Sequence, residues 1–471
     1  MEYEVVIGLE IHAELLTRSK VFCSCKNEFG GEENTRVCPR CSALPGSLPL
    51  FNKGAAELAV KAGLALNCKV NNFSAFDRKN YFYPDLPKAY QITQFNHPIC
   101  ENGYLMVGNK KIRINRIHIE EDAGKLVHDE TENVSLADYN RCGVPLIEIV
   151  TEPDIRSAEE ARGFVEEVAL TLKYAGVCDA KMEQGSLRCD VNISIMPKGS
   201  DTFGTRTEIK NLNSFRSVVR AIEYEFTRQK ELLESGGRVI QQTLHWNDAL
   251  GVTSALRSKE EAHDYRYFPE PDIPPLFITD EEILAISKDL PVMPAVRQGR
   301  YQNKLGLSPA DAALLIAEKS LADFFETAVE VYNNPKSIAA MILVELLRRM
   351  NDASKKIEDV KITPVDLATL CKMADDGTVS RGAAKDILKV MFENGGEPMD
   401  IAKQNGMLMS NDTAEVEKVA DEILTANPKA VTEYKEGSGK VFGFLMGQMC
   451  RALGKSANPA IIKKVLEEKL K

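Results

Sequence analysis

The sequence predicts an α+β protein in which a domain built round an antiparallel sheet precedes an all-helical region. Three observations support this class. Up to about residue 290, short runs that alternate apolar and polar residues are mixed with helical patterns and with Gly, Asn and Pro turns. A proline-rich, non-helical connector lies near the end of this region, at 269–275. Beyond Pro294 the apolar residues recur almost entirely at helical spacing.

Five short segments before residue 290 have the alternation expected of strands with one polar face. Successive side chains of a strand point to opposite sides, so each segment gathers its charged residues on one face. In the first segment, for example, Glu10, His12 and Glu14 share the face opposite Leu9 and Ile11. The segments are 9–15, 116–122, 146–150, 187–195 and 207–210.

The region after residue 294 carries helix-start signals. Ser308-Pro309 is a cap followed by a first-turn proline. A break at 406–411 precedes several short helices, and Asn458-Pro459 marks the start of the last one. We therefore expect three domains, at 1–293, 294–405 and 406–471.

Composition excludes several classes of protein. No apolar stretch is long enough to span a bilayer, and the first residues do not resemble a signal peptide, so we expect a cytoplasmic protein. Eleven cysteines in such a chain argue against a disulfide framework. The net charge of −10 argues against nucleic-acid binding over the whole surface. From Asn427 onward, however, nine Lys and Arg face only four Asp and Glu, which favours a local RNA-binding tail.

The carboxylates on the predicted strands are unusual. Glu and Asp are depleted in strands, and like charges opposite each other are destabilising. Polar alternation is also what any antiparallel sheet with one wet face shows. Five acidic strands together nevertheless indicate a face that needs cations, and hard oxygen ligands suit Mg²⁺ with a nucleotide phosphate. Neither a GxxxxGK[ST] loop nor a GxGxxG turn follows a strand, so a nucleotide would be held through carboxylate-bound metal.

Four cysteines form two close pairs near residue 30. Cys23-x-Cys25 and Cys38-x-x-Cys41 are separated by twelve residues, and four thiolates in two pairs suit a tetrahedral Zn²⁺ site. Four protein ligands leave no open position, so this site would be structural. Free reduced thiols or a redox pair are the alternatives.

Several long motifs resemble one known family, the B subunit of the glutamine-dependent aspartyl/glutamyl-tRNA amidotransferase (the GatB/GatE family). They occur in matching order, and the resemblance covers essentially the whole chain. The motifs are GLEIHAEL (8–15), DRKNYFYPDLPKAYQITQ (77–94), RIHIEEDAGK (116–125), DYNRCGVPLIEIVTEPDIRS (138–157), GSLRCDVNIS (185–194), GTRTEIKNLNSFR (204–216) and DYRYFPEPD (264–272).

The resemblance implies a catalytic domain of the glutamine synthetase type, with a zinc-knuckle insertion at 23–41, then a helical linker domain and a small YqeY-like tail that contacts tRNA. It implies that the chain phosphorylates the side-chain carboxylate of a misattached Glu or Asp with ATP, after which ammonia displaces the phosphate. It implies two partners, an amidase-type A subunit that releases ammonia from glutamine and a small C subunit. Whether Glu-tRNA, Asp-tRNA or both are substrates stays open.

On this basis we assign site residues. Glu10, His12, Glu121 and Glu148 are the first choice as Mg²⁺ ligands, and Glu120, Asp190 and Glu208 are the second. The Glu120–Glu121 doublet cannot place both side chains on one face of a regular strand. Arg188 and Lys210 are candidates for phosphate contacts. Cys23, Cys25, Cys38 and Cys41 are expected to bind a structural Zn²⁺.

Alternatives remain for several of these residues and for the function. His12 could be a hydrogen-bonded core histidine, and Glu148 could pair with Arg141. Lys79 and Lys88 could line an ammonia path or contact a partner, or could be lysines at the edge of an aromatic core. A stand-alone ATP-dependent ligase and a non-catalytic tRNA scaffold are the rival functions; the basic tail argues against the first and the acidic strands against the second.

Overall fold

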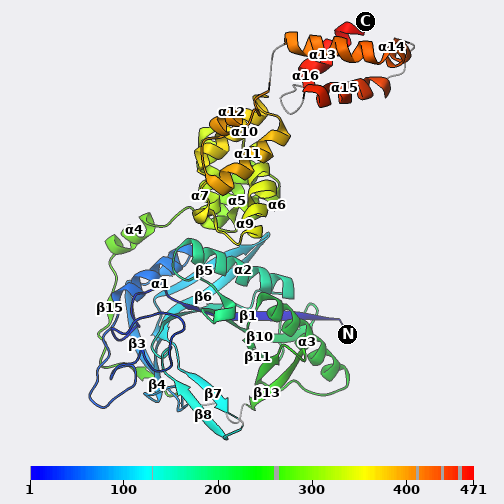
Figure 1. The fold of residues 1–471 in the computed structure, drawn as a ribbon. Helices are drawn as coiled ribbons and strands as arrows, with labels where there is room; N and C mark the ends of the chain where they lie inside the picture. The colour runs from blue at the N-terminus through cyan, green and yellow to red at the C-terminus, as the bar shows by residue number, and fades with distance from the viewer. Residues whose placement is uncertain are drawn as a thin grey trace. The chain divides into compact units, whose positions relative to one another are not determined.

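The computed structural model describes residues 2–129, 131–258, 265–409, 413–435, 440–453 and 459–470 (Figure 1). The chain divides into two compact units, Met1–Pro294 and Ala295–Lys471. The first is a mixed unit with a large sheet and the second is helical, which is the α+β class that the sequence predicts.

A nine-stranded sheet forms the centre of the first unit, in the order β13-β12-β11-β10-β1-β9-β6-β5-β2. All five predicted acidic segments lie in its strands. The bounds are β1 Tyr3–Glu14, β2 Lys69–Val70, β5 Cys100–Val107, β6 Lys110–Glu121, β9 Pro145–Thr151, β10 Leu187–Pro197, β11 Thr207–Leu212, β12 Gln242–Asn247 and β13 Val252–Ser258.

The sheet is antiparallel except at one point, which corrects the expectation of a wholly antiparallel sheet. Strands β11 and β12 pair in parallel, with Glu208 opposite Thr243. A parallel pair needs a crossover connection, and the helix α3 (Phe215–Glu234) supplies it between these two strands.

Strand β1 occupies the middle of the sheet, and its alternation sets the two faces. Ile7, Leu9, Ile11 and Ala13 are fully or almost fully buried, whereas the residues between them are only partly covered. In the antiparallel register, Glu10 lies opposite Asp190 of β10, and His12 lies opposite both Arg188 of β10 and Glu148 of β9.

Three helices cover the apolar face of the sheet. They are α1 (Lys53–Ala65), α2 (Ala158–Tyr174) and α3, and their buried residues join those of the strands in one core. Each begins at a polar cap whose side chain accepts a hydrogen bond from the first turn: Asn52, Ser157 and Ser214. With one face packed in this way, the opposite face of the sheet is left for polar side chains.

Smaller β elements complete the first unit. β3 pairs with β4, β14 and β15, and β7 pairs with β8 as a hairpin. Arg78 of β3 forms a bidentate ion pair with the buried Glu270, which fixes the segment after β14 to β3. The bounds are β3 Phe73–Asn80, β4 Tyr90–His97, β7 Lys125–Asp129, β8 Val134–Asp138, β14 Phe268–Pro269, β15 Leu276–Phe277, the helix α4 Asp280–Lys288 and the 3-10 helix η1 Met182–Gln184.

The second unit is helical and has two separate cores. The first core is built from residues between Tyr301 and Ala402. Ser308 accepts a hydrogen bond from Asp311 N and caps α6, with Pro309 in the first turn, as predicted. The elements are α5 Pro294–Asn303, α6 Pro309–Ile316, α7 Lys319–Val331, α8 Pro335–Ala340, the π-helix η3 Met341–Leu346, α9 Leu347–Asp352, the 3-10 helix η4 Ile357–Asp359, α10 Pro364–Asp375, α11 Arg381–Asn394 and α12 Pro398–Gln404.

The other core of this unit belongs to four short helices. Val416 and Ala420 of one helix pack with Leu445, Met449 and Leu466 of two others. The last helix begins at Pro459, as the sequence predicts, whereas Asn458 lies outside the described residues, as does part of the predicted break at 406–411. The helices are α13 Thr413–Ala426, α14 Pro428–Lys435, α15 Lys440–Leu453 and α16 Pro459–Lys469.

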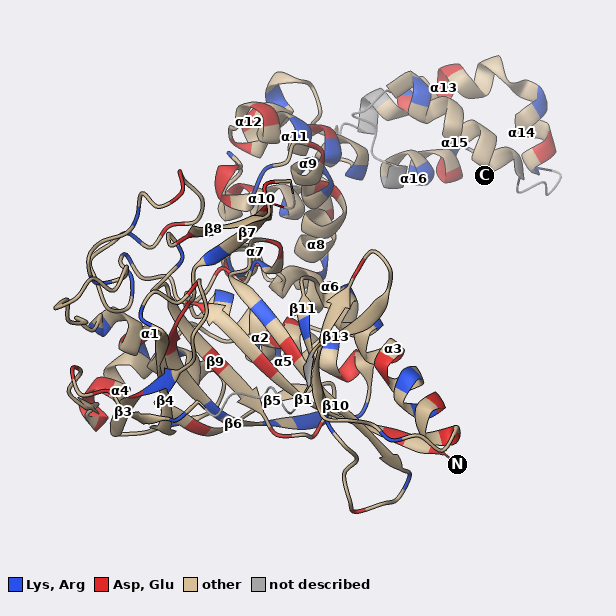
Figure 2. Ribbon diagram, turned by 90° about the horizontal axis from the view of Figure 1, so that it is seen from below, with Lys and Arg blue, Asp and Glu red and all other residues tan. Residues whose placement is uncertain are grey.

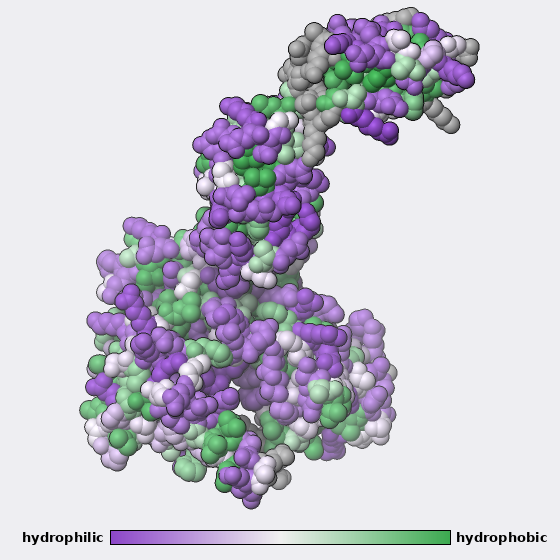
Figure 3. All heavy atoms as spheres, viewed as in Figure 1, coloured by the Kyte–Doolittle hydropathy of each residue, from purple (hydrophilic) through white to green (hydrophobic). Residues whose placement is uncertain are grey.

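Hydrophilic residues predominate on the face drawn in Figure 3, and the apolar patches between them are small. Among the helices of the described residues, none combines the length and the apolar character needed to cross a bilayer.

Candidate active site

Acidic and basic side chains gather on the polar face of the large sheet. Figure 2 shows red and blue segments along the neighbouring central strands. The face is built by β1, β6, β9, β10 and β11, the five strands whose acidic alternation is visible in the sequence. It contains two groups of side chains that could each hold a metal ion.

The first group, here called cluster A, consists of His12, Glu120 and Glu148. His12 Nε2 lies 3.5 Å from Glu120 Oε1 and 3.6 Å from Glu148 Oε2. One ligand atom from each residue lies within 4.8 Å of the others, so the three could converge on one cation. They come from three adjacent strands, β1, β6 and β9, and the antiparallel register brings them together.

A buried histidine, His118, contacts both carboxylates of cluster A. His118 Nε2 lies 3.1 Å from Glu148 Oε2 and 3.8 Å from Glu120 Oε2. Burial by itself lowers the pKa of His118, but the charges of Glu148 and Glu120 outweigh it and raise the pKa to about 9. Burial likewise opposes ionisation of Glu148, yet His118, His12 and Lys79 together hold its pKa below the usual range. Glu148 is therefore an anion held by cations, which suits a metal ligand.

The second group, cluster B, consists of Glu10, Asp190 and Glu208. Lys210 Nζ lies 2.6 Å from Asp190 Oδ2 and 2.7 Å from Glu208 Oε1. The side-chain amide of Asn192 donates to Glu10 Oε1 at 2.9 Å. Burial and the charge of Glu148 raise the pKa of Glu10, and a bound cation would counter both effects.

The two clusters are neighbours because β1 contributes to both. Glu10 and His12 are two residues apart on one face of this strand, which corresponds to about 7 Å. Each cluster offers two or three carboxylate oxygens, the hard donors that Mg²⁺ prefers. A phosphate group placed over β1 would thus lie beside both clusters.

Of the acidic doublet, only Glu120 lies in cluster A. Glu121 points to the other face of β6, where it forms a close ion pair with Lys88 and accepts a hydrogen bond from Ile92 N at 2.9 Å. The alternation of β6 causes this separation. The structure therefore does not bring Glu121, a first-choice ligand, together with His12 and Glu148, and it brings Glu120 there instead.

The two cations that the sequence suggests for phosphate binding already have acidic partners. Lys210 pairs with cluster B, and Arg188 Nη2 donates to Asp122 Oδ2 at 2.7 Å. The alternative partner of Glu148, Arg141, instead lies with its Nε 3.4 Å from Asp122 Oδ2. Burial, with the nearby charge of Asp122, raises the pKa of Glu14 to about 7.

Lys79 approaches cluster A from β3. Its Nζ lies 4.8 Å from the ring centroid of Tyr265 and 5.8 Å from that of Tyr81. Burial lowers the pKa of this lysine, but the charges of Glu120 and Glu148 more than compensate and raise it. The role of Lys79 beside the acidic residues cannot be read from the sequence, because β3 is far from β6 and β9 along the chain.

A cavity of about 280 Å³ adjoins cluster B on the same face. Its wall includes Gly8, Glu10, Val150, Asn192, Phe203 and Arg206. Gly204 completes this wall, where a Cβ atom would meet the carbonyl oxygen of Ile195 at 2.1 Å. Only glycine lets the loop approach β10 so closely.

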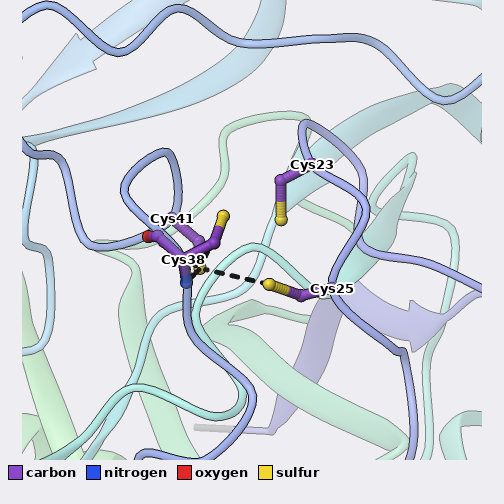
Figure 4. A group of neighbouring side chains, drawn as sticks. All are labelled: Cys23, Cys25, Cys38 and Cys41. Carbon is purple, nitrogen blue, oxygen red and sulfur yellow. Dashed lines mark hydrogen bonds between the residues drawn. The ribbon is translucent and has the colours of Figure 1, made fainter.

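The four cysteines converge as the spacing predicts (Figure 4). Cys41 Sγ lies 4.0 Å from Cys25 Sγ and 3.8 Å from Cys38 Sγ, and all four sulfurs are within 4.8 Å of one another. Zn–S bonds of about 2.3 Å in a tetrahedron place sulfurs about 3.8 Å apart, so the group fits zinc. The fully buried Lys20 lies with its Nζ 3.7 Å from Cys41 Sγ and offsets the negative charge.

Comparison with known sequences agrees with this geometry. Residues 5–284 match the GatB/GatE catalytic domain, and residues 323–470 match a domain described as the GatB domain. A relative from Ruminiclostridium cellulolyticum, named as the B subunit of an aspartyl/glutamyl-tRNA(Asn/Gln) amidotransferase, is 55% identical over 100% of this chain and 98% of its own.

The chain belongs to the GatB/GatE family. Relatives of the same name from Caldicellulosiruptor saccharolyticus and Myxococcus xanthus are 52% and 49% identical, each over 100% of this chain and 99% of the relative. The resemblance drawn from the sequence motifs is thus confirmed. In this family member the motifs lie in strands and loops around the polar face, except that Asp264 falls outside the described residues.

Sequence reasoning gave no role to His118 and did not see the pairing of Asp122 with Arg188. The signal for His118 was present, since it alternates with Glu120 on the polar face of the predicted strand. The pairing of Asp122 depends on how the end of β6 meets β10, which no local pattern reveals.

Proposed function

We propose that this chain is the B subunit of a glutamine-dependent amidotransferase that converts glutamyl-tRNA(Gln), aspartyl-tRNA(Asn) or both to the amide. In this proposal the polar face of the large sheet catalyses transfer of the γ-phosphoryl group of ATP to the side-chain carboxylate of the misattached amino acid. Ammonia then attacks the acyl phosphate, and phosphate leaves as the amide forms. The observation that carries the proposal is the pair of adjacent acidic clusters on one sheet face of a GatB/GatE family member.

The chemistry explains why such a face is needed. A carboxylate is a poor electrophile because oxide would have to leave, and phosphorylation supplies a better leaving group. Phosphoryl transfer needs charge neutralisation and alignment more than a protein nucleophile. Bound Mg²⁺ would neutralise the phosphates. Cluster A and cluster B would hold it through His12, Glu120 and Glu148, and through Glu10, Asp190 and Glu208. Glu121 would not take part in these clusters, because it pairs with Lys88 on the opposite face of β6.

Positive side chains would orient the anions. Lys79 would contact the carboxylate that accepts the phosphoryl group, because it comes from β3, outside the large sheet, and is subject to the charges of Glu120 and Glu148. Lys210 and Arg188 are already paired with carboxylates. Each would contact phosphate only by giving up part of these ion pairs. The cavity beside cluster B would receive the base and ribose of ATP, since it opens next to Glu10 and includes the aromatic ring of Phe203.

The domain organisation fits the same proposal. We propose a catalytic domain at 1–293 of the glutamine synthetase type, a helical linker domain at 294–405 and a YqeY-like tail domain at 406–471. The excess of basic residues in the tail would bind tRNA phosphates. The partners would be an amidase-type A subunit and a small C subunit, and the complex would work in the cytoplasm. Cys23, Cys25, Cys38 and Cys41 would bind Zn²⁺ for structural purposes only.

The test is ATP hydrolysis by the chain assembled with the amidase and small subunits. Glutamyl-tRNA, aspartyl-tRNA and uncharged tRNA would be compared, with amide formation measured after glutamine is added. Hydrolysis that depends on a misacylated tRNA supports the proposal and identifies the substrate. Hydrolysis without tRNA would favour a small-molecule ligase, and tRNA binding without hydrolysis would favour a scaffold.

A matched pair of variants tests the site itself. Glu148→Gln keeps the size of the side chain but removes a cluster A charge, and we expect loss of the phosphorylation of glutamyl-tRNA. Glu4→Gln makes the same change on β1 outside both clusters and should leave the rate unchanged. A wild-type rate with wild-type Mg²⁺ dependence in Glu148→Gln would remove Glu148 from the site.

A further inference from the structure

Arg116 of β6 adds a guanidinium to the polar face, and no ion pair with a carboxylate is formed by it among the described residues. Its Nε is buried, and the described residues provide no hydrogen-bond partner for it. Arg188 also has a buried Nε without a partner, but its Nη2 pairs with Asp122, and Lys210 pairs with Asp190. A buried, unpaired guanidinium nitrogen is costly, and a functional role such as binding an anion is one of the explanations for it in a native protein.

The register places Arg116 in the same row of the sheet as two residues of the cavity wall. Arg116 lies opposite Val150 of β9, and Val150 lies opposite Glu10 of β1, so the three share one row on one face. Two strand spacings amount to about 10 Å, which an arginine side chain and a phosphate group can bridge. Val150 and Glu10 both line the cavity of about 280 Å³ next to cluster B.

Arg116 also does not use the acidic residue nearest to it in the sheet. Glu101 of β5 lies directly opposite Arg116 on its other side, yet no ion pair forms between these two described residues. Two residues further along β6, His118 holds Glu148. Arg116 therefore lies one strand away from a cavity-lining residue, Val150, and two residues from His118 on β6, with its fork of N–H donors not engaged by carboxylate among the described residues.

We infer that Arg116 binds the phosphates of ATP, through the planar fork of donors that suits phosphate oxygens. This inference rests on the proposed function, because it takes the cavity beside cluster B as the nucleotide site. A phosphodiester of the bound tRNA offers the same chemistry. The nucleotide is favoured because Val150, the residue directly opposite Arg116, and Glu10 in the same row both line the cavity.

The experiment compares Arg116→Met and Arg116→Lys with the wild-type chain in the assembled complex. Binding of a non-hydrolysable ATP analogue with Mg²⁺ is measured by equilibrium dialysis, and tRNA binding is measured separately. We expect the analogue to bind about 10- to 100-fold more weakly to Arg116→Met, with partial recovery in Arg116→Lys and no change for tRNA. Arg113→Met is the control, because Arg113 lies on the same strand but pairs with Asp154.

Several outcomes would overturn the inference. Analogue binding that stays within a factor of two in Arg116→Met would do so, as would an equal loss in Arg113→Met, which would indicate only a change of net charge. A loss of tRNA affinity with unchanged analogue binding would assign Arg116 to the RNA backbone instead. The wild-type complex keeps the tests separate: failure of its tRNA-dependent ATP hydrolysis contradicts the proposed function, whereas the variants test Arg116. Unfolding followed by the fluorescence of Trp246 verifies that each variant is folded.

Discussion

His118 Nε2 lies 3.1 Å from Glu148 Oε2, and this contact holds a carboxylate of cluster A in place from the neighbouring strand β6. Partners of this kind orient metal ligands, and their loss costs about 10- to 100-fold in metal affinity. We predict that His118→Leu raises the Mg²⁺ concentration needed for half-maximal phosphorylation by about that factor. His118→Gln, which can still donate a hydrogen bond, should be affected less.

His97 provides the control for this prediction. It lies at the end of β4 against Phe73, away from both clusters. His97→Leu should leave the Mg²⁺ dependence unchanged. A His118→Leu variant that loses activity at every Mg²⁺ concentration, with an unchanged midpoint, would show that His118 does not act through the metal ligands.

The ion pair of Arg78 with Glu270 provides a prediction about stability. The side chain of Glu270 is 0% exposed, so Arg78→Met would leave a buried carboxylate without its cation. Breaking such a pair costs about 3–5 kcal/mol. Urea unfolding followed at Trp246, the single tryptophan and a residue of the first unit, measures the free energy of unfolding of that unit.

Two comparisons make this measurement decisive. The double variant with Arg78→Met and Glu270→Met should recover much of the loss, because no charge stays buried. Arg113→Met breaks a pair whose arginine is 60% exposed and should cost far less, because water already screens this pair. Equal losses in Arg78→Met and Arg113→Met would contradict the explanation by burial.

Metal analysis tests the cysteine group. We predict one Zn²⁺ for each chain, lost in Cys38→Ser and retained in Cys371→Ser, since Cys371 is buried in the second unit. Lys20→Met should release zinc about tenfold faster to a chromogenic chelator, because the ammonium beside Cys41 is removed. Zinc content and release that are the same in Cys38→Ser as in the wild type would rule out the site.

The tail is tested by salt dependence. We predict that replacing Arg451, Lys463 and Lys464 with Ala weakens tRNA binding and lowers the slope of log K against log salt by about one for each tRNA phosphate that is no longer neutralised. A chain ending at residue 409 should have a strongly raised KM for tRNA and an unchanged unfolding transition at Trp246. Lys389→Ala, in the other helical core, is the control, and an unchanged KM on truncation would contradict the role of the tail.

Local patterns predicted much of the fold. When one face of a sheet is buried, apolar and polar residues alternate along each strand, and this alternation is visible in the sequence. The acidic residues of β1, β6, β9, β10 and β11 were recognised in this way, and so was the cysteine group. The choice between Glu120 and Glu121 was not, because alternation separates the two but does not say which face is polar at the end of β6. The parallel pairing of β11 with β12 also escaped, since it depends on the path of α3.

Partners that arrive from distant segments were equally hard to foresee. Lys79 comes to cluster A from β3, which belongs to another sheet, and Arg188 at the start of β10 meets Asp122, just after β6, across the two intervening strands β1 and β9. Such contacts depend on long-range topology, whereas alternation depends only on neighbours in the chain.

The central place of β1 has a consequence for the order in which a newly made chain can fold. β9 and β10 flank this strand in the sheet, but both are synthesised long after it. Until then, the apolar side chains of β1 have no neighbouring strands to pack with. Cluster A cannot assemble until β9 has been synthesised, and cluster B cannot assemble until β10 and β11 have been synthesised. We therefore expect the nascent chain to need protection of this segment from aggregation, and ribosomes stalled before residue 197 to carry β1 exposed to protease.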